Sequence, residues 1–118
     1  MSLFQQRDVY FLVNGAKPLY LINADLRELS FRHTDLKQAN FSGARLDEAS
    51  FFQADLTGAI FESASLANAG LSGCQGAGAR FNEARLTNAE LSGSNWPKAQ
   101  LVGASLTGAI LVETGAPC

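Results

Sequence analysis

Large apolar residues recur at every fifth position of this chain, from residue 21 to residue 111. Nineteen positions belong to this series, and all except Gly76 carry Leu, Phe or Trp. A second series lies two residues earlier, from residue 24 to residue 114, where fourteen of nineteen positions are Ala. The members of the first series that we expect at the centre of a core are Leu26, Phe31, Phe41, Leu46, Phe51, Phe61, Leu66, Gly76, Phe81, Leu86, Trp96 and Leu106.

A period of five matches neither standard element. On an α-helix each step would rotate the apolar stripe by about 140°, and on a strand each step would move the side chain to the opposite face. We therefore expect the chain to turn once per five residues. The large residue and the small residue two positions before it then point toward a common axis, and the other three positions face water.

A spacing of twenty residues sorts the large positions into four columns. One column is Leu throughout, at positions 26, 46, 66, 86 and 106. The Phe residues of the series fall into two opposite columns, Phe41, Phe61 and Phe81 in one and Phe31 and Phe51 in the other. A three-sided coil would scatter these residues, so the spacing favours a coil with four sides.

The segment SGCQGAGARF (72–81) has three glycines in six positions and invites comparison with a phosphate-binding loop. A following Lys and a following helix are both absent from the sequence pattern, and the glycines keep the register of the repeat. Gly76 lies at a large position, and Trp96 follows it one period of twenty later. We expect the indole to fill the volume that Gly76 leaves, with Cys74 and Ser94 replacing Ala nearby to adjust the coil to this ring.

The recurring pattern A-[D/N]-L-x-x appears as ADLRE (24–28), ANFSG (39–43), ADLTG (54–58) and ASLTG (104–108). It resembles the pentapeptide-repeat family over about residues 19–116. The resemblance implies an all-β solenoid, a right-handed four-sided β-helix with four pentapeptides in each coil. Stacked at the inter-strand spacing, about five coils would form a column roughly 24 Å tall.

The two ends of such a column expose backbone and core that need a cover. We expect residues 1–18 to form an N-terminal cap with a short helix, because Ser2 and Gln5 match a capping box and Asn14-Gly15 matches a helix end. Residues 19–118 then form the β-helix. No comparable cap is visible after Leu111, which predicts either a fragment of a longer protein or self-association through the C-terminal coil.

Composition and charge exclude several classes of function. The chain of 118 residues has nine Lys and Arg against eleven Asp and Glu, a net charge of −2, so nucleic-acid binding is unlikely on electrostatic grounds. Two cysteines provide no disulfide framework. The sequence contains no membrane span, and Arg7 and Asp8 precede only a short apolar run, which argues against a signal peptide. These features predict a cytoplasmic protein.

Reactive side chains form no recognisable catalytic, metal or cofactor motif. His33 lies next to Asp35 on outward positions without a nucleophile, and His33, Cys74 and Cys118 have no ligand spacing. Between coils, we expect Asp25 to pair with Arg45 and Arg27 with Asp47. Phe52 is an aromatic residue on an outward position, where a cation–π contact with Arg32 or a partner contact is possible.

These observations predict a non-enzymatic structural or protein-interaction scaffold without a cofactor, whose unknown protein partner contacts Phe52, Arg32 or Leu111. One alternative is the subset of the family that resembles duplex DNA and binds DNA gyrase, some members conferring quinolone resistance. A column roughly 24 Å tall would then need on the order of fourteen net negative charges. Another alternative is a repeat domain of a larger bacterial effector or secretion adaptor.

Overall fold

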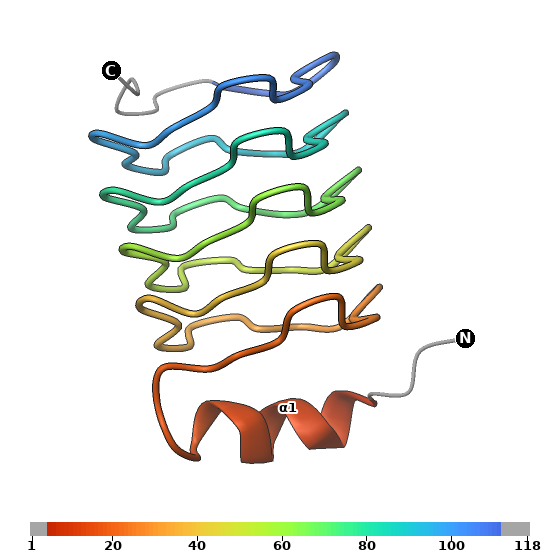
Figure 1. Ribbon diagram of the computed structural model, residues 1–118, viewed down its shortest axis with the longest axis vertical. Coiled ribbons are helices and arrows are strands. Elements are labelled where there is room, and N and C mark those ends of the chain that lie inside the picture. Colours follow the sequence, from red (N-terminus) through yellow and green to blue (C-terminus); the bar gives the residue numbers. More distant parts are fainter. Residues whose placement is uncertain (1–4, 112–118) are drawn as a thin grey trace.

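The computed structural model describes residues 5–111, which form a stack of coils with one helix at its N-terminal end (Figure 1). The helix, α1, spans Gln6–Val13. No strand within the described residues is longer than a single bridged residue. Instead, one residue on each side of a coil pairs in parallel with the residue twenty positions later, from Tyr20 with Asn40 to Glu90 with Ile110. The period of twenty therefore corresponds to one coil with four sides.

Backbone hydrogen bonds follow this pairing through the stack. The N–H of Arg45 donates to the carbonyl of Ala24 at 2.8 Å, and the N–H of Leu26 donates to the carbonyl of Arg45 at the same distance. The backbone groups of each side thus bond to the coil above and the coil below, as in a parallel sheet.

A tight turn connects each side of the coil to the next. In one example, the N–H of Ala44 donates to the carbonyl of Phe41 at 2.9 Å, and Gly43 between them has a φ of 67°. The position two residues after each large residue has a positive φ in every repeat from Asn23 to Gly108. L-residues with a side chain disfavour this conformation and glycine does not. The turn therefore explains Gly73 and Gly78 of the segment 72–81, whereas Gly76 occupies an inward position.

The interior is a layered apolar core. Rings of the same column stack on one another, with centroids 5.0 Å apart for Phe41 and Phe61 and 4.9 Å apart for Phe61 and Phe81. Rings of the two opposite columns meet edge to face, as Phe51 and Phe61 do at 5.8 Å. The expected core residues are buried except Leu106, which is partly exposed at the C-terminal end and packs against the core.

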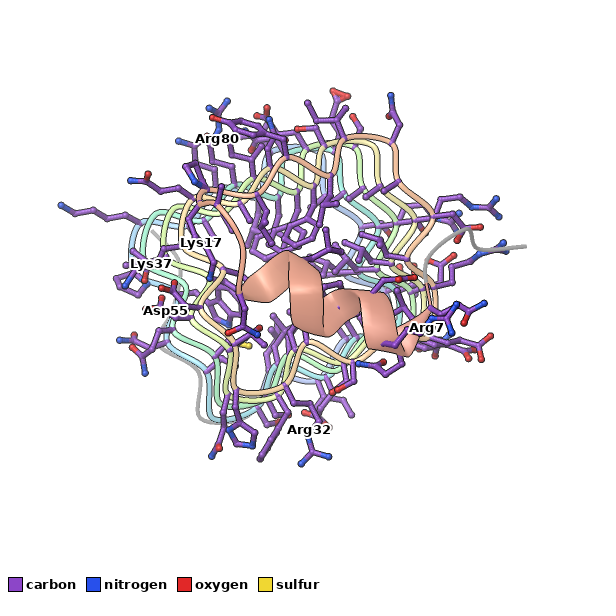
Figure 2. The ribbon with its side chains drawn as sticks, turned by 90° about the horizontal axis from the view of Figure 1, so that it is seen from below. Arg7, Lys17, Arg32, Lys37, Asp55 and Arg80 are labelled. Carbon is purple, nitrogen blue, oxygen red and sulfur yellow. The ribbon has the colours of Figure 1, made fainter. Side chains whose placement is uncertain are left out.

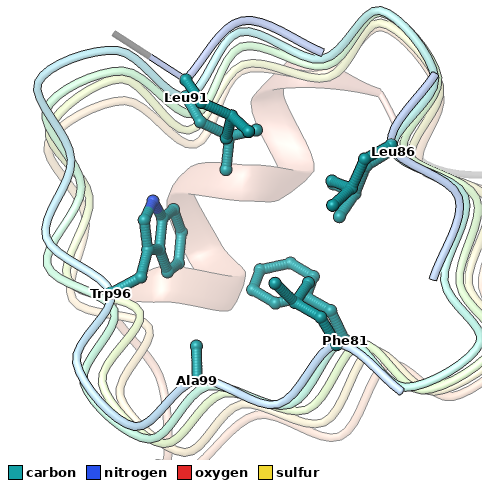
Figure 3. A pocket seen from close by; sticks show the side chains of 8 residues that line it. Phe81, Leu86, Leu91, Trp96 and Ala99 are labelled. Atoms are coloured by element: carbon teal, nitrogen blue, oxygen red, sulfur yellow. The ribbon is translucent and has the colours of Figure 1, made fainter. Parts of the chain in front are cut away.

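Trp96 lies directly over Gly76, as the sequence pattern predicts. A Cβ atom added at Gly76 would lie 1.9 Å from Cε3 and 2.1 Å from Cζ3 of the indole, so the ring occupies the space of the missing side chain. The ring also meets Phe81 edge to face at 5.3 Å. Figure 3 shows Phe81, Leu86, Leu91 and Trp96 facing one another from the four sides of the coil.

The coil adjusts to this ring at the neighbouring turn. The hydroxyl of Ser94 donates to the carbonyl of Leu71, and it accepts the N–H of Cys74 at 3.1 Å. This hydroxyl therefore bridges two backbone groups of a kind that bond to each other directly in most of the other turns, for example between Ala54 and Phe51. A Ser at the small position thus lets the turn below open while its polar groups stay satisfied.

Helix α1 lies across the N-terminal end of the stack (Figure 2), with Val9 buried. Of the expected capping box, Ser2 lies outside the described residues. The helix begins at Gln6, and Oδ2 of Asp8 accepts the N–H of Gln5 at 2.7 Å. The carboxylate of Asp8 thus satisfies one of the unbonded N–H groups at this helix end.

Two polar side chains bond to the exposed backbone edge of the first coil. The amide of Gln6 accepts the N–H of Ser30 at 2.7 Å and donates to the carbonyl of Ser30 at 2.8 Å. It supplies the donor and the acceptor that a preceding coil would provide. The ammonium group of Lys17 donates to the carbonyl of Asp35 at 2.6 Å on the next side of the coil.

The contact between Gly76 and Trp96 predicts strong coupling between these residues. We expect Gly76→Leu alone to destabilise by overpacking, by about 1–3 kcal/mol. We expect Trp96→Leu alone to cost about 2–4 kcal/mol because it opens a cavity over Gly76. The double variant recreates the Leu-on-Leu packing of Leu36 and Leu56 and should lose less than either change alone. Denaturant unfolding of all four proteins measures this cycle, and additive losses would contradict it.

The turn geometry predicts different effects of two glycine substitutions. Gly78 has a φ of 68° with no atom within 4 Å of an added Cβ, so Gly78→Ala tests the backbone conformation alone. We expect a loss of about 1 kcal/mol. Gly70 lacks a positive φ and its added Cβ would meet only Oγ of Ser50 at 3.9 Å. Gly70→Ala should therefore be neutral or slightly stabilising in the same denaturant assay, and equal effects of the two variants would contradict the explanation.

Candidate functional site

The outward side chains are the candidate functional groups of this molecule, because the inward positions are filled by the core. The described residues contain no group of three or more His, Cys, Asp or Glu side chains placed to hold a metal ion. No helix within the same residues is long and apolar enough to cross a membrane. Charged and aromatic side chains on the four sides are therefore the groups that could bind a partner.

Cys74 belongs to the structure of the coil. Its side chain is buried, and Sγ donates to the carbonyl of Phe51 at 2.9 Å. Burial raises the pKa of this thiol to about 12, so it stays protonated at neutral pH. A protonated, buried thiol is a poor nucleophile and a poor metal ligand.

Four ion pairs join charged side chains of the described residues, two within one repeat and two between neighbouring coils, and they differ from the expected ladder. Arg27 binds Asp25 of its own repeat with Nε and Nη2, each at 2.8 Å, instead of pairing with Asp47. This hydrogen bonding lowers the pKa of Asp25 to about 2. Asp47 accepts the hydroxyl of Ser65 and the N–H of Ala67 of the next coil.

The preference of Arg27 for Asp25 has a simple geometric cause. Asp25 and Arg27 flank the inward Leu26, so both side chains project outward from the same short extended segment. The two groups can therefore meet without crossing to another coil. An ion pair between coils does occur elsewhere, where Nη2 of Arg80 lies 2.6 Å from Oε2 of Glu62.

The corner formed by Arg32, His33 and Phe52 gathers cationic and aromatic groups. Cζ of Arg32 lies 5.1 Å from the centroid of the Phe52 ring, which is the cation–π contact that the spacing of twenty predicts. The ring of His33 meets the same phenyl ring edge to face, with centroids 5.7 Å apart. We call Arg32, His33 and Phe52 the aromatic corner. Figure 2 labels Arg32 on a different side of the solenoid from Lys17, Lys37 and Asp55.

A second candidate surface is the coil at the C-terminal end. Leu111 is 49% exposed and Val102 76% exposed, whereas the equivalent Leu91 and Asn82 one coil earlier are better buried. Among residues 5–111, the N–H groups of Leu101 and Leu106 donate to no following coil. The side chains around the hollow of Figure 3 are apolar: Phe81, Leu86, Leu91, Trp96, Ala99, Leu101, Leu106 and Leu111.

Trp96 carries the one buried side-chain nitrogen or oxygen among the described residues that lacks a hydrogen-bond partner, its Nε1. An unpaired buried donor costs about 1–3 kcal/mol. The walls around it are apolar, so the surroundings offer no set of polar groups that would select a ligand. We assign the indole to core packing over Gly76.

Sequence reasoning missed Gln6 and Lys17 as capping residues. Both precede the first repeat, so the five-residue pattern that places every later side chain says nothing about them. An amide and an ammonium group before the first coil look like ordinary surface residues until the fold shows that they reach Ser30 and Asp35.

Comparison with known proteins agrees with this architecture. The family model described as pentapeptide repeats matches residues 20–53, 44–75 and 84–114. The chain belongs to the pentapeptide-repeat family, whose solved members imply a right-handed β-helix. The matches omit residues 76–83, the stretch that begins at Gly76. No curated protein sequence matches the chain significantly.

Three solved structures illustrate the likeness. HetL, a pentapeptide repeat protein involved in heterocyst differentiation regulation from the cyanobacterium Nostoc sp. strain PCC 7120, is 29% identical with a TM-score of 0.78. The alignment covers 87% of this chain and 51% of HetL, so the chain spans about half the length of that protein.

The other two structures are more distant. Rfr23 from the cyanobacterium Cyanothece 51142 is 22% identical with a TM-score of 0.48, and the alignment covers 80% of this chain and 85% of Rfr23. Trypsin-treated QnrB1, a plasmid-mediated fluoroquinolone resistance protein, is 22% identical with a TM-score of 0.42. That alignment covers 86% of this chain and 67% of QnrB1.

Proposed function

We propose that this chain is a non-enzymatic scaffold that binds a protein partner through its sides and its C-terminal coil. The observation that carries this proposal is that different positions of each repeat have separate structural roles. Two of five positions build the core and one adopts the turn conformation, which leaves the remaining outward side chains free to vary without changing the backbone. Such a column presents side chains at fixed spacing, which suits recognition of a partner surface.

In this proposal the scaffold consists of about five coils, and α1 acts as its N-terminal cap. The hydrogen bonds of Gln6 to Ser30 and of Lys17 to Asp35 support the capping role, because they cover polar backbone groups at the edge of the first coil. The cap makes the sides and the opposite end the surfaces available to a partner.

We rank the DNA-mimic alternative lower on charge. A column of this height needs on the order of fourteen negative charges to match duplex DNA. The net charge of the chain is only −2. Acidic groups are also neutralised locally, as Asp25 is by Arg27 and Glu62 by Arg80.

The second alternative is a repeat domain of a larger bacterial protein. It is favoured by the exposure of the apolar side chains of Val102, Ile110 and Leu111. In that setting the column would act as a docking module.

Capture from cells of the source organism tests the scaffold proposal. The bait is the full chain, compared with Arg32→Gln, Leu111→Lys and the control Arg85→Gln, whose arginine lies on another side. We expect at least one protein, quantified by mass spectrometry, to be enriched by the original chain and by the control and lost with one of the other two variants. If every captured protein is retained equally by all four baits, these two surfaces do not bind a partner.

Self-association through the C-terminal coil is a further part of this proposal. The molecule measures 24 × 19 Å across its two shorter axes. One end therefore offers at most about 450 Å² per partner, below the roughly 800 Å² of a stable interface. We expect weak association, visible by sedimentation equilibrium only at tens to hundreds of micromolar and lost in Leu111→Lys. A strict monomer over this range, unchanged by the substitution, would contradict it.

A further inference from the structure

Arg32 differs from the other cationic side chains of the first coil. Within residues 19–38, Arg27 is bound to Asp25, and Nζ of Lys37 lies 3.7 Å from Asp35 and 3.9 Å from Asp55. Arg32 has an aromatic ring as its neighbour instead of a carboxylate. Among the cations of this coil, its charge is therefore the one left without an acidic partner in the described structure.

The contact with Phe52 limits where the Arg32 guanidinium group lies. Cζ of Arg32 lies over the Phe52 ring, 5.1 Å from its centroid, so the ring covers one side of the guanidinium group. A guanidinium group has five N–H donors, and a phenyl ring has no carboxylate that would occupy them, so they stay available to a ligand. His33 packs against the same ring from the side and helps to hold it in place.

The surface beside the aromatic corner consists of small residues and lacks acidic side chains. In the same column, Phe52 is followed one and two coils later by Ser72 and Ser92, and the next column contains Gly73 and Gly93. Residues 29–33, 49–53 and 69–73 contain no acidic residue. The pKa of Glu90, the first acid on this side, is lowered by hydrogen bonds from the Ser92 side chain and from the Ser92 N–H, the latter at 3.1 Å.

We propose that the aromatic corner binds a Glu or Asp side chain of an extended segment in a partner protein, with the rest of that segment lying over the small residues Ser72 and Gly73. This inference rests on the scaffold function proposed above and names the chemistry of the partner. A guanidinium edge matches a carboxylate with two parallel hydrogen bonds. The small side chain of Ser72 and the lack of one at Gly73 let a backbone approach closely, and the absence of acids on residues 29–33, 49–53 and 69–73 removes repulsion.

Charge favours a carboxylate over a phosphorylated residue. A phosphate group carries nearly two negative charges and is usually held by a cluster of arginines. The aromatic corner offers one permanent cation, Arg32, which balances a single carboxylate. The lysines nearest in sequence, Lys17 and Lys37, already bond to a carbonyl and to carboxylates on another side.

A peptide-binding experiment tests this inference with the full chain. The probes are a blocked, fluorescein-labelled peptide of sequence Gly-Ser-Glu-Leu-Glu-Ser-Gly, the same peptide with both Glu replaced by Gln, and the same peptide with phosphoserine in place of each Glu. Fluorescence anisotropy gives the affinity, and ¹⁵N–¹H NMR spectra locate the bound peptide. The variants are Arg32→Gln, Phe52→Leu and the control Arg85→Gln.

We expect the Glu peptide to shift the side-chain Nε–H signal of Arg32 and the backbone signals of Phe52, Ser72 and Gly73. Arg32→Gln should weaken this peptide at least about fivefold, Phe52→Leu about two- to threefold, and Arg85→Gln not at all. The Gln peptide should bind much more weakly, and rising salt should weaken the Glu peptide.

Three results would overturn the inference: equal binding of the Glu and Gln peptides, full binding to Arg32→Gln, or tighter binding of the phosphoserine peptide that depends on Arg32. The scaffold proposal is judged separately by the capture experiment. Partners lost only with Leu111→Lys would keep the scaffold and reject the carboxylate site, whereas partners lost with Arg32→Gln that lack an acidic segment would also reject the site.

Discussion

The parallel backbone pairing between residues twenty positions apart is the interaction on which this molecule depends. Each side of a coil contributes a single bridged residue, so residues 5–111 contain no long strand that could absorb an error in register. Insertion of one residue would move every later large side chain off the axis. This constraint explains why the period of five is unbroken over about ninety residues. The same period sets the positions of the core side chains and of the outward columns.

Much of the architecture could be predicted because the neighbours of a residue in this fold lie at a fixed distance in sequence, one coil of twenty residues before and after it. The position of Trp96 over Gly76 and the contact of Arg32 with Phe52 both follow from adding twenty to a residue number. The sequence does not reveal that the outward glycines have a positive φ. Exposed positions and positive-φ positions both favour Gly and polar residues, so the residue types do not tell the two apart. The register of the repeat accounts for Gly73 and Gly78 in the sequence, and the backbone shows that this register position is also the positive-φ position of the turn.

What escaped prediction involves side chains with a choice of partners. Arg27 could reach Asp47 in the next coil or Asp25 in its own, and the shorter path along one segment determined the outcome. Ser94 was expected to adjust the coil near Trp96, but the way its hydroxyl bridges Cys74 and Leu71 depends on atomic positions that no repeat pattern contains. The aromatic corner, in contrast, has few alternatives for Arg32, which is why spacing alone located it.

The side-chain amide of Gln6 has a consequence for assembly beyond the single molecule. Repeating coils of this kind could in principle continue from one molecule into the next, because the last coil of one copy and the first coil of another have complementary backbone edges. Such head-to-tail contact does not close on itself and would produce open filaments. Ser30 and Asp35 are already bonded to Gln6 and Lys17, and α1 lies across the same end. In the proposed capping role, the helix blocks the first coil of every copy and so prevents head-to-tail growth of the stack.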